Sequence, residues 1–174
     1  KKLEAEIVRF QNDYEKWIAV VGLLNGRPYE VFTGKAEDFY LPPFVQKGWV
    51  IKNKTEKEKS QYDFQFEDKQ GYKITIEGLS RMFNKEYWNY AKLISGILRH
   101  GMPLPFVVEL ISKLNLDSDS INTWKVGVER ALKKFIPDGT KVADKVCSNC
   151  GDTEGLIYEE GCLKCKSCGY SKCG

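Results

Sequence analysis

Apolar and polar residues alternate with a period of two through the first half of the chain. Residues 4–10 alternate in this way and predict a strand, and the almost unbroken apolar run at 17–24 predicts a buried one. Asn25 and Gly26 then separate this run from a further strand pattern at 28–32. Because Asn and Gly tolerate positive φ angles, the segments 17–24 and 28–32 are predicted to form a hairpin with a tight turn at Asn25 and Gly26.

A second group of strand patterns follows a break at Pro42 and Pro43. Residues 48–52 predict a short strand, and the charged stretch at 53–59 predicts a solvated hairpin tip. The segments 62–66 and 72–76 both alternate and predict a second hairpin. The first of them places three aromatic residues on one face. We interpret this face as covered by helices, and not as a platform on which bases stack.

The period changes from two to about 3.6 after Asn84, which indicates helices. Asn84 is a suitable N-cap, and Gly101 is suitable for the position that follows a helix C-terminus. Three helices are predicted, from Asn84 to about His100, at 105–114, and from Ser118 or Ser120 to about Phe135. Antiparallel strands followed by helices predict an α+β fold, with the helices packed on one face of the sheet.

Composition places the chain among globular proteins. Its 174 residues are 42% hydrophobic and 29% charged, which suits one domain plus a small module. The net charge of +3 is too small to indicate nucleic acid binding. No apolar run is long enough to cross a membrane, and no signal peptide opens the chain, so we expect a cytoplasmic protein. The first residue, Lys1, indicates a fragment or a processed chain, and the single histidine, His100, is interpreted as structural.

All six cysteines lie within the last 28 residues, and this asymmetry divides the chain. We predict an α+β accessory domain at 1–135, a flexible linker at 136–146 and a cysteine-rich tail at 147–174. A tail of this size cannot bury a hydrophobic core of its own. In a reducing compartment, clustered cysteines more often bind metal or exchange electrons than form structural disulfides.

Four of the cysteines have the spacing of a zinc ribbon. The motif Cys-x-x-Cys-Gly occurs at 147–151 and again at 165–169, so the whole pattern is C-x₂-C-x₁₄-C-x₂-C. Four thiolates at a tetrahedral point are a typical zinc site. The predicted ligands are Cys147, Cys150, Cys165 and Cys168. Residues 162–165 also form a Cys-x-x-Cys motif, but it lacks the following glycine.

This assignment leaves Cys162 and Cys173 without a metal. A thiol near a chain end is accessible, as thiol–disulfide exchange requires, and nearby lysines (Lys164, Lys166, Lys172) can lower its pKa. The alternative in which one or both of these cysteines are idle, or form a disulfide without a redox role, stays open. A ribbon that binds nucleic acid or protein without redox chemistry is a second alternative. The segment 141–174 has five lysines and five acidic residues, which disfavours nucleic acid.

The terminal run at 160–174, EGCLKCKSCGYSKCG, resembles the C-terminus of the large chain of ribonucleotide reductase, most of all in the adenosylcobalamin-dependent class. Two further segments agree with it. The run NGRPYEVF at 25–32 is similar to a hairpin of the small domain that follows that family's catalytic barrel, and LRHGMPL at 98–104 is similar to a helix junction of the same domain.

The resemblance implies a role in the reduction of ribonucleoside diphosphates to deoxyribonucleotides. In that family each turnover oxidises two barrel cysteines, a cysteine pair on the C-terminus re-reduces them, and thioredoxin or a similar dithiol recharges the pair. Cys162 and Cys173 would be this shuttle, with Cys165 as an alternative partner. The implied partners are the catalytic barrel and thioredoxin. Adenosylcobalamin is implied for the complete enzyme and not for this segment, which lacks the barrel and should be inactive alone.

Overall fold

The structure is a computed structural model that describes residues 1–12, 14–54, 60–142 and 145–173. The chain forms two compact units, Lys1–Gly101 and Met102–Gly174, which we call the sheet unit and the helix–ribbon unit. Most of the charged loop predicted at 53–59 lies outside the described residues. No helix in the described part of the chain is both long and apolar enough to span a membrane.

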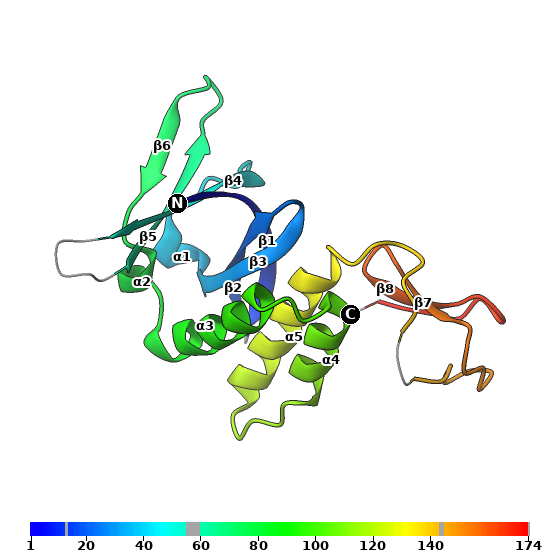
Figure 1. Ribbon diagram of the computed structural model, residues 1–174. Helices are drawn as coiled ribbons and strands as arrows, with labels where there is room; N and C mark the ends of the chain where they lie inside the picture. Colours follow the sequence, from blue (N-terminus) through cyan, green and yellow to red (C-terminus); the bar gives the residue numbers. More distant parts are fainter. Residues whose placement is uncertain (13, 55–59, 143–144, 174) are drawn as a thin grey trace. The chain divides into compact units, whose positions relative to one another are not determined.

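The sheet unit is built on one antiparallel sheet of six strands (Figure 1). The order across the sheet is β3-β2-β1-β4-β5-β6, so β1 pairs with both β2 and β4. The predicted hairpin is present, since Asn25 and Gly26 adopt φ angles of 53° and 77° between β2 and β3. The strands are β1 (Lys2–Asn12), β2 (Glu15–Leu24), β3 (Arg27–Lys35), β4 (Lys47–Lys54), β5 (Ser60–Glu67) and β6 (Lys73–Ile76).

Three helices complete the sheet unit, and the longest packs against β3. They are α1 (Ala36–Phe39), α2 (Leu79–Met82) and α3 (Lys85–Arg99). Asn84 caps α3 as predicted, because its side-chain oxygen accepts a hydrogen bond from the N–H of Glu86 at 2.9 Å. The hydroxyl of Ser95 in α3 accepts from the N–H of Val31 in β3 at 3.0 Å, which ties the helix to the edge of the sheet.

The core of the sheet unit is rich in aromatic side chains. Phe64 of β5 is fully buried, and its ring lies 5.7 Å from that of Phe39 in α1. Phe39 also contacts Phe83, at 5.5 Å between ring centroids. Phe64 and Phe66 of the aromatic face predicted at 62–66 are therefore buried against apolar side chains, as expected of a covered sheet face, whereas Tyr62 is only partly buried.

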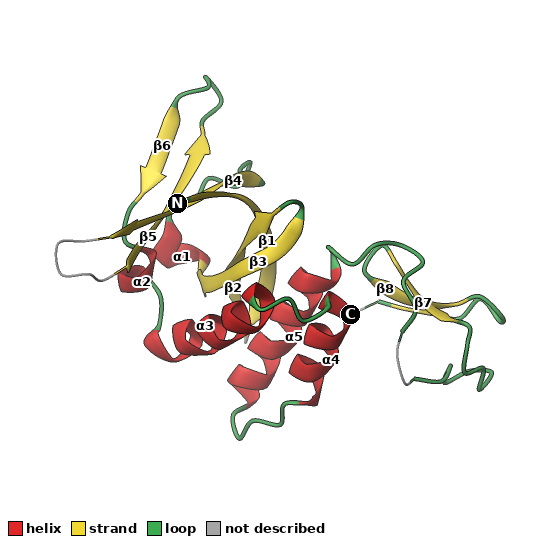
Figure 2. Ribbon diagram, in the orientation of Figure 1, coloured by secondary structure: helices red, strands yellow, loops and turns green. Residues whose placement is uncertain are grey.

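The helix–ribbon unit contains two helices that pack together and a small three-stranded sheet (Figure 2). Its helices are α4 (Leu104–Lys113) and α5 (Asp119–Lys133), and its strands are β7 (Leu156–Glu159), β8 (Cys162–Cys165) and β9 (Ser171–Lys172). The predicted α+β class is confirmed, and the three long helices lie where the 3.6-residue period placed them. The two four-residue helices were not predicted, because one turn is too short to show a period.

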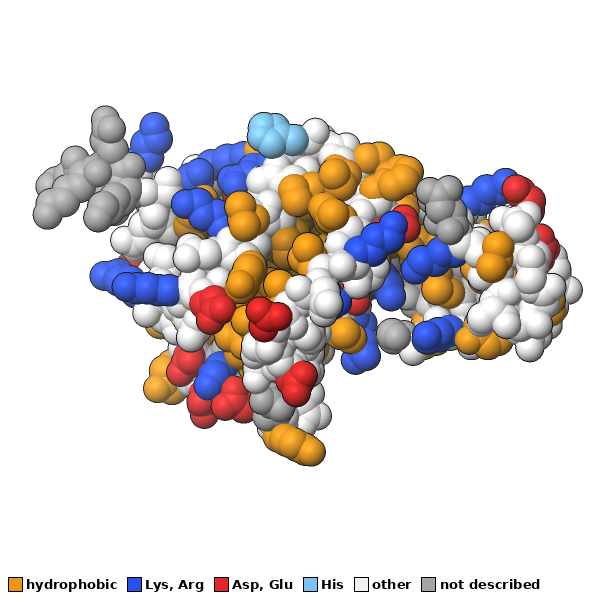
Figure 3. Space-filling model, turned by 90° about the horizontal axis from the view of Figure 1, so that it is seen from below, with side chains coloured by type: hydrophobic (Ala, Val, Ile, Leu, Met, Phe, Trp, Pro, Cys, Tyr) orange, Lys and Arg blue, Asp and Glu red, His pale blue; other side chains and the backbone are white. Residues whose placement is uncertain are grey.

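Part of the segment predicted as a flexible linker is hydrogen-bonded to β7. The N–H of Gly139 donates to the carbonyl of Tyr158 at 2.7 Å, and the N–H of Tyr158 donates to that of Thr140 at 2.8 Å. The N–H of Val142 donates to the carbonyl of Leu156 at 3.1 Å. The first compact unit ends at Gly101, which has a φ of 81° and follows the exposed His100 (Figure 3, pale blue).

Candidate functional site

Two matching turns present the four cysteines of the predicted zinc ribbon. In the first, the N–H of Gly151 donates to the carbonyl of Cys147 at 2.8 Å, and in the second Gly169 donates to Cys165 at 2.9 Å. The two glycines have φ angles of 75° and 76°, a region that other residues enter only with strain. The glycine after each Cys-x-x-Cys motif therefore closes the turn that aims two thiols at the same point.

The two turns bring four sulfur atoms into one cluster. The Sγ atoms of Cys147, Cys150, Cys165 and Cys168 all lie within 4.8 Å of one another. Cys147 and Cys168 are 3.7 Å apart, as are Cys150 and Cys165. A tetrahedral zinc site with Zn–S bonds of about 2.3 Å has S–S edges of about 3.8 Å. The spacing of the sulfurs thus fits a four-thiolate metal site.

Polar groups beside Cys168 favour its thiolate form, whereas the pKa of Cys150 rises to about 12 because the hydrogen bond from the Asp152 backbone is outweighed by desolvation and by the other three thiols. The side-chain amide of Asn149 donates to Sγ of Cys168 at 3.5 Å and, together with the backbone N–H of Tyr170, lowers the pKa of Cys168 to about 6. Asp152 accepts a hydrogen bond from the Ser167 hydroxyl, which joins the two turns. Metal ligands must be deprotonated, so the contacts of Cys168 support metal binding.

The sequence reasoning did not identify Asn149, Asp152 or Ser167 as parts of the cluster. Asn149 lies inside a Cys-x-x-Cys motif, which was a usable signal, because a donor at that position can reach a sulfur of the facing turn. The contact between Asp152 and Ser167 joins residues 15 positions apart. Nothing in their local sequence indicates it.

Cys162 and Cys165 lie at the two ends of β8 and not in a turn. Side chains of a strand alternate between its faces, so residues three positions apart point to opposite sides. Cys165 is fully buried in the metal cluster, whereas Cys162 is only partly buried. The strand thereby separates the two kinds of cysteine, and the alternative motif at 162–165 does not form a second metal-binding turn.

Cys162 is joined to Cys173 in a disulfide, and the other four cysteines are free thiols. The antiparallel register of β8 and β9 pairs Leu163 with Lys172 and Lys164 with Ser171. Continued by one residue, the same register places Cys162 directly opposite Cys173, and their Cα atoms are 4.5 Å apart. Directly opposed residues of antiparallel strands share a face, so the ladder itself aligns the two sulfurs. Cys173 is exposed.

The charges around this pair differ from the sequence-based expectation in one respect. Lys164 was expected to lower the pKa of a neighbouring thiol, but its ammonium group forms an ion pair with Glu159 at 2.7 Å. The carboxylate of Glu159 offsets that positive charge. Lys166 and Lys172 are both exposed on the same ribbon.

The ribbon, residues 147–173, is attached to the C-terminal end of α5 within its unit. The N–H of Glu160, in the turn between β7 and β8, donates to the carboxylate of Asp138 at 2.7 Å. A Cβ atom at Gly161 would lie 3.6 Å from the backbone of Lys133, so the turn and the helix end are in contact. Tyr158 is buried, and burial together with the nearby Glu109 and Glu129 raises its pKa. The cysteine pair is therefore held on a folded support.

These features describe an α+β protein whose C-terminal ribbon brings together four cysteines in an arrangement that could hold a metal ion. Comparison with known families shows that the chain belongs to the NrdJ homologue C-terminal domain family, which matches residues 3–137; NrdJ is the cobalamin-dependent ribonucleotide reductase. The resemblance stated above is confirmed at this level. The match ends before the first cysteine. No curated protein and no solved structure matches the chain.

Proposed function

We propose that the chain re-reduces the active site of a ribonucleoside-diphosphate reductase through Cys162 and Cys173. The observation that carries the proposal is the register of β8 and β9, which holds these two sulfurs opposite each other. Alternation along β8 places Cys162, and with it the opposed Cys173, on the face opposite to Cys165 of the four-cysteine cluster. A pair that can close and open without disturbing the metal ligands is suited to repeated thiol–disulfide exchange.

The proposed exchange conserves electrons and protons. Reduced Cys162 and Cys173 supply two electrons and two protons to a disulfide in the catalytic barrel. A tail thiolate attacks one barrel sulfur, the barrel S–S bond breaks, and a mixed disulfide forms. The second tail thiol then displaces the other barrel sulfur, which leaves a barrel dithiol and the Cys162–Cys173 disulfide. Thioredoxin or a similar dithiol reverses this oxidation, and the exposed Cys173 is the sulfur within its reach.

The four-cysteine cluster has a separate, structural role in this proposal. Zn²⁺ held by Cys147, Cys150, Cys165 and Cys168 would fix the ribbon, since closed tetrathiolate sites are typically structural. Metal-bound thiolates would also stay out of the exchange reaction. The ribbon's contacts with Asp138 and Lys133 then present the redox pair on a compact carrier and not on a loose peptide.

The proposal is tested by replacing the pair in the complete reductase. With Cys162→Ser or Cys173→Ser, thioredoxin-driven turnover should fall at least about 100-fold, because one thiol cannot complete the exchange. Single turnover, and turnover driven by a small dithiol that reaches the barrel directly, should be retained. Ser171→Ala is the matched control, since it alters an exposed β9 residue without removing a thiol.

Either of two results would overturn the shuttle. The first is normal thioredoxin-driven turnover in both cysteine variants. The second is failure of thioredoxin, its reductase and NADPH to reduce the disulfide of this chain, measured as consumption of one NADPH per chain. Loss of small-dithiol turnover as well would assign the cysteines a structural role.

A further inference from the structure

A cavity of about 340 Å³ opens in the sheet unit, between α3 and the strands β3, β4 and β5. Its volume lies near the lower end of the range of about 300–1,000 Å³ that is typical of small-molecule sites. The lining residues that matter here are of two kinds, aromatic (Phe32, Tyr62, Trp88) and cationic (Lys52, Lys92, Arg99). The ribonucleotide reductase function proposed above uses none of them.

The aromatic residues form one continuous wall of the cavity. The rings of Phe32 and Trp88 are stacked with their centroids 5.0 Å apart, and Tyr62 meets Trp88 edge-on at 5.9 Å. Phe32 is almost fully buried, whereas Tyr62 and Trp88 are only partly buried. Partly buried aromatic rings beside a cavity offer their remaining surface to a flat ligand, and each stacked base contributes about 1–3 kcal/mol in known sites.

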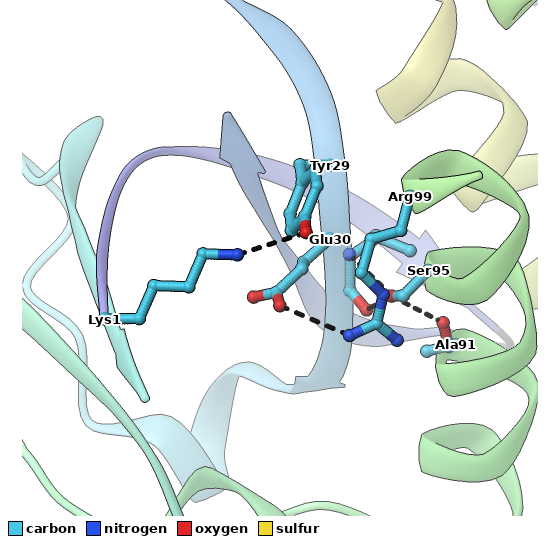
Figure 4. Close-up of polar contacts among 7 residues, drawn as sticks. Lys1, Tyr29, Glu30, Ala91, Ser95 and Arg99 are labelled. Atoms are coloured by element: carbon cyan, nitrogen blue, oxygen red, sulfur yellow. Dashed lines mark hydrogen bonds and ion pairs between the residues drawn. The ribbon is translucent and has the colours of Figure 1, made fainter. Parts of the chain in front are cut away.

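The polar side of the cavity carries an excess of positive charge. Arg99 contacts the buried carboxylate of Glu30 at 3.6 Å (Figure 4), which holds the guanidinium in place and leaves several of its N–H groups for other partners. Lys52 lies 5.4 Å from the ring of Tyr62, so a cation borders the aromatic wall. With Lys92, three cations face one carboxylate, a net charge of +2.

This combination is selective for one class of ligand. A phosphate monoester carries close to two negative charges at neutral pH and three acceptor oxygens, which match a net charge of +2 and several N–H donors. A carboxylate carries only one charge. A flat heterocycle matches the aromatic wall. We infer that this cavity binds a nucleotide, with the base against Tyr62 and Trp88 and the phosphate near Lys52, Lys92 and Arg99.

Binding of AMP to the 174-residue chain, measured by isothermal titration calorimetry, tests the inference. We expect one site per chain. The double variant Lys52→Gln/Lys92→Gln should weaken AMP binding by about tenfold or more, as the loss of hydrogen bonds to a charged group predicts. Trp88→Leu should weaken it by about fivefold or more through lost stacking.

The matched control removes two positive charges elsewhere in the same unit. Lys16 and Lys85 are exposed and do not line the cavity, so Lys16→Gln/Lys85→Gln should leave AMP affinity within about twofold of the original. Trp88 also contacts Phe32 in the core, so its variant is interpreted only if amide exchange shows an intact β3. The lysine variant changes the exposed Lys92 and the partly buried Lys52, and it decides the question if Trp88→Leu does not fold.

Several results would overturn the inference. The first is failure of AMP to bind at millimolar concentration. The second is binding of inorganic phosphate as tight as that of AMP, which would reduce the site to an anion site without a base pocket. Adenosine binding as tightly as AMP would remove the phosphate site instead. Equal weakening of AMP binding by Lys16→Gln/Lys85→Gln would show that AMP affinity depends on the net charge of the protein and not on this cavity. Cys162→Ser should leave AMP affinity unchanged, so this test is independent of the redox proposal.

Discussion

The sheet unit and the ribbon are stabilised by different chemistry. The sheet unit buries twelve apolar side chains in one cluster around Phe39 and Phe64. The ribbon buries a smaller cluster of Cys147, Leu156 and Cys165, and two of these three are metal-ligand candidates. A segment this small gains little from burial, so we expect its fold to depend on bonds between a metal ion and the four sulfurs. Cysteine therefore has two proposed roles in the ribbon, a structural role at the four-cysteine cluster and a redox role at Cys162 and Cys173.

Removal of one predicted metal ligand is expected to have the largest effect of the substitutions considered, and that effect should be limited to the ribbon. Cys147→Ser should abolish metal binding and unfold the ribbon, because a structural zinc site contributes about 10–16 kcal/mol to folding in small domains. Amide exchange of β8 should then become rapid, while that of β5 in the sheet unit stays slow. Elemental analysis of the purified chain should show about one zinc before the substitution and none after it.

The matched control for this experiment is Ser148→Ala, which alters the neighbouring exposed residue and keeps all four thiols. It should retain zinc and slow exchange in β8. Zinc content that is unchanged in the Cys147→Ser variant would show that the ligands are assigned wrongly. Rapid exchange in β5 would contradict the independence of the two regions.

Truncation of a side chain in the aromatic core should cost less free energy, and it should destabilise the sheet unit and not the ribbon. Phe64 is fully buried, and Phe64→Ala should lower the free energy of unfolding of the sheet unit by about 3–5 kcal/mol, measured by chemical denaturation. Zinc content should not change. Leu93→Ala is the control, because Leu93 is 68% exposed and its truncation should cost less than about 0.5 kcal/mol. Loss of zinc from the Phe64 variant would mean that the ribbon depends on the core.

Local patterns were sufficient to predict the long elements and the meeting of four cysteine sulfurs. The Asn25–Gly26 hairpin and the Asn84 cap depend on residues a few positions apart, and both are present. The cysteine spacing predicted which four sulfurs would meet, because each Cys-x-x-Cys-Gly turn is itself a local structure. The glycines at 151 and 169 were the decisive signal.

Features that depend on pairing between distant segments could not be predicted. The contact of residues 139–142 with β7 joins a polar stretch, typical of a linker, to a strand almost twenty residues away. The alignment of Cys162 with Cys173 depends on β9, which has two residues and no visible period. The nucleotide-sized cavity combines residues from β3, β4, β5 and α3, whose separate patterns indicate only core and surface.

The smallest expected effect is on the pH dependence of the free energy of unfolding, to which one buried carboxylate in each unit contributes. Burial raises the pKa of Glu30, and the nearby Arg99, Lys1 and Lys52 offset this only in part. The folded sheet unit therefore keeps a proton on Glu30 at a pH where the unfolded chain, with a pKa near 4.5, has lost it. Glu30 therefore adds to the free energy of unfolding at low pH. This contribution should decline as the pH rises from about 4.5 through the raised pKa of the folded state.

Glu30→Gln should remove that decline, which denaturation curves for both proteins between pH 4.5 and neutral pH would show as a change in slope. Glu129→Gln is the comparison in the helix–ribbon unit, where burial also raises the pKa of Glu129 and its Oε1 atom has no hydrogen-bond partner among the described residues. The Glu129→Gln substitution should change amide hydrogen exchange in α5 and not in the sheet unit. A Glu30→Gln variant with the original pH slope would show that Arg99 compensates fully for the burial of this carboxylate, so that ion pairing rather than desolvation controls its charge.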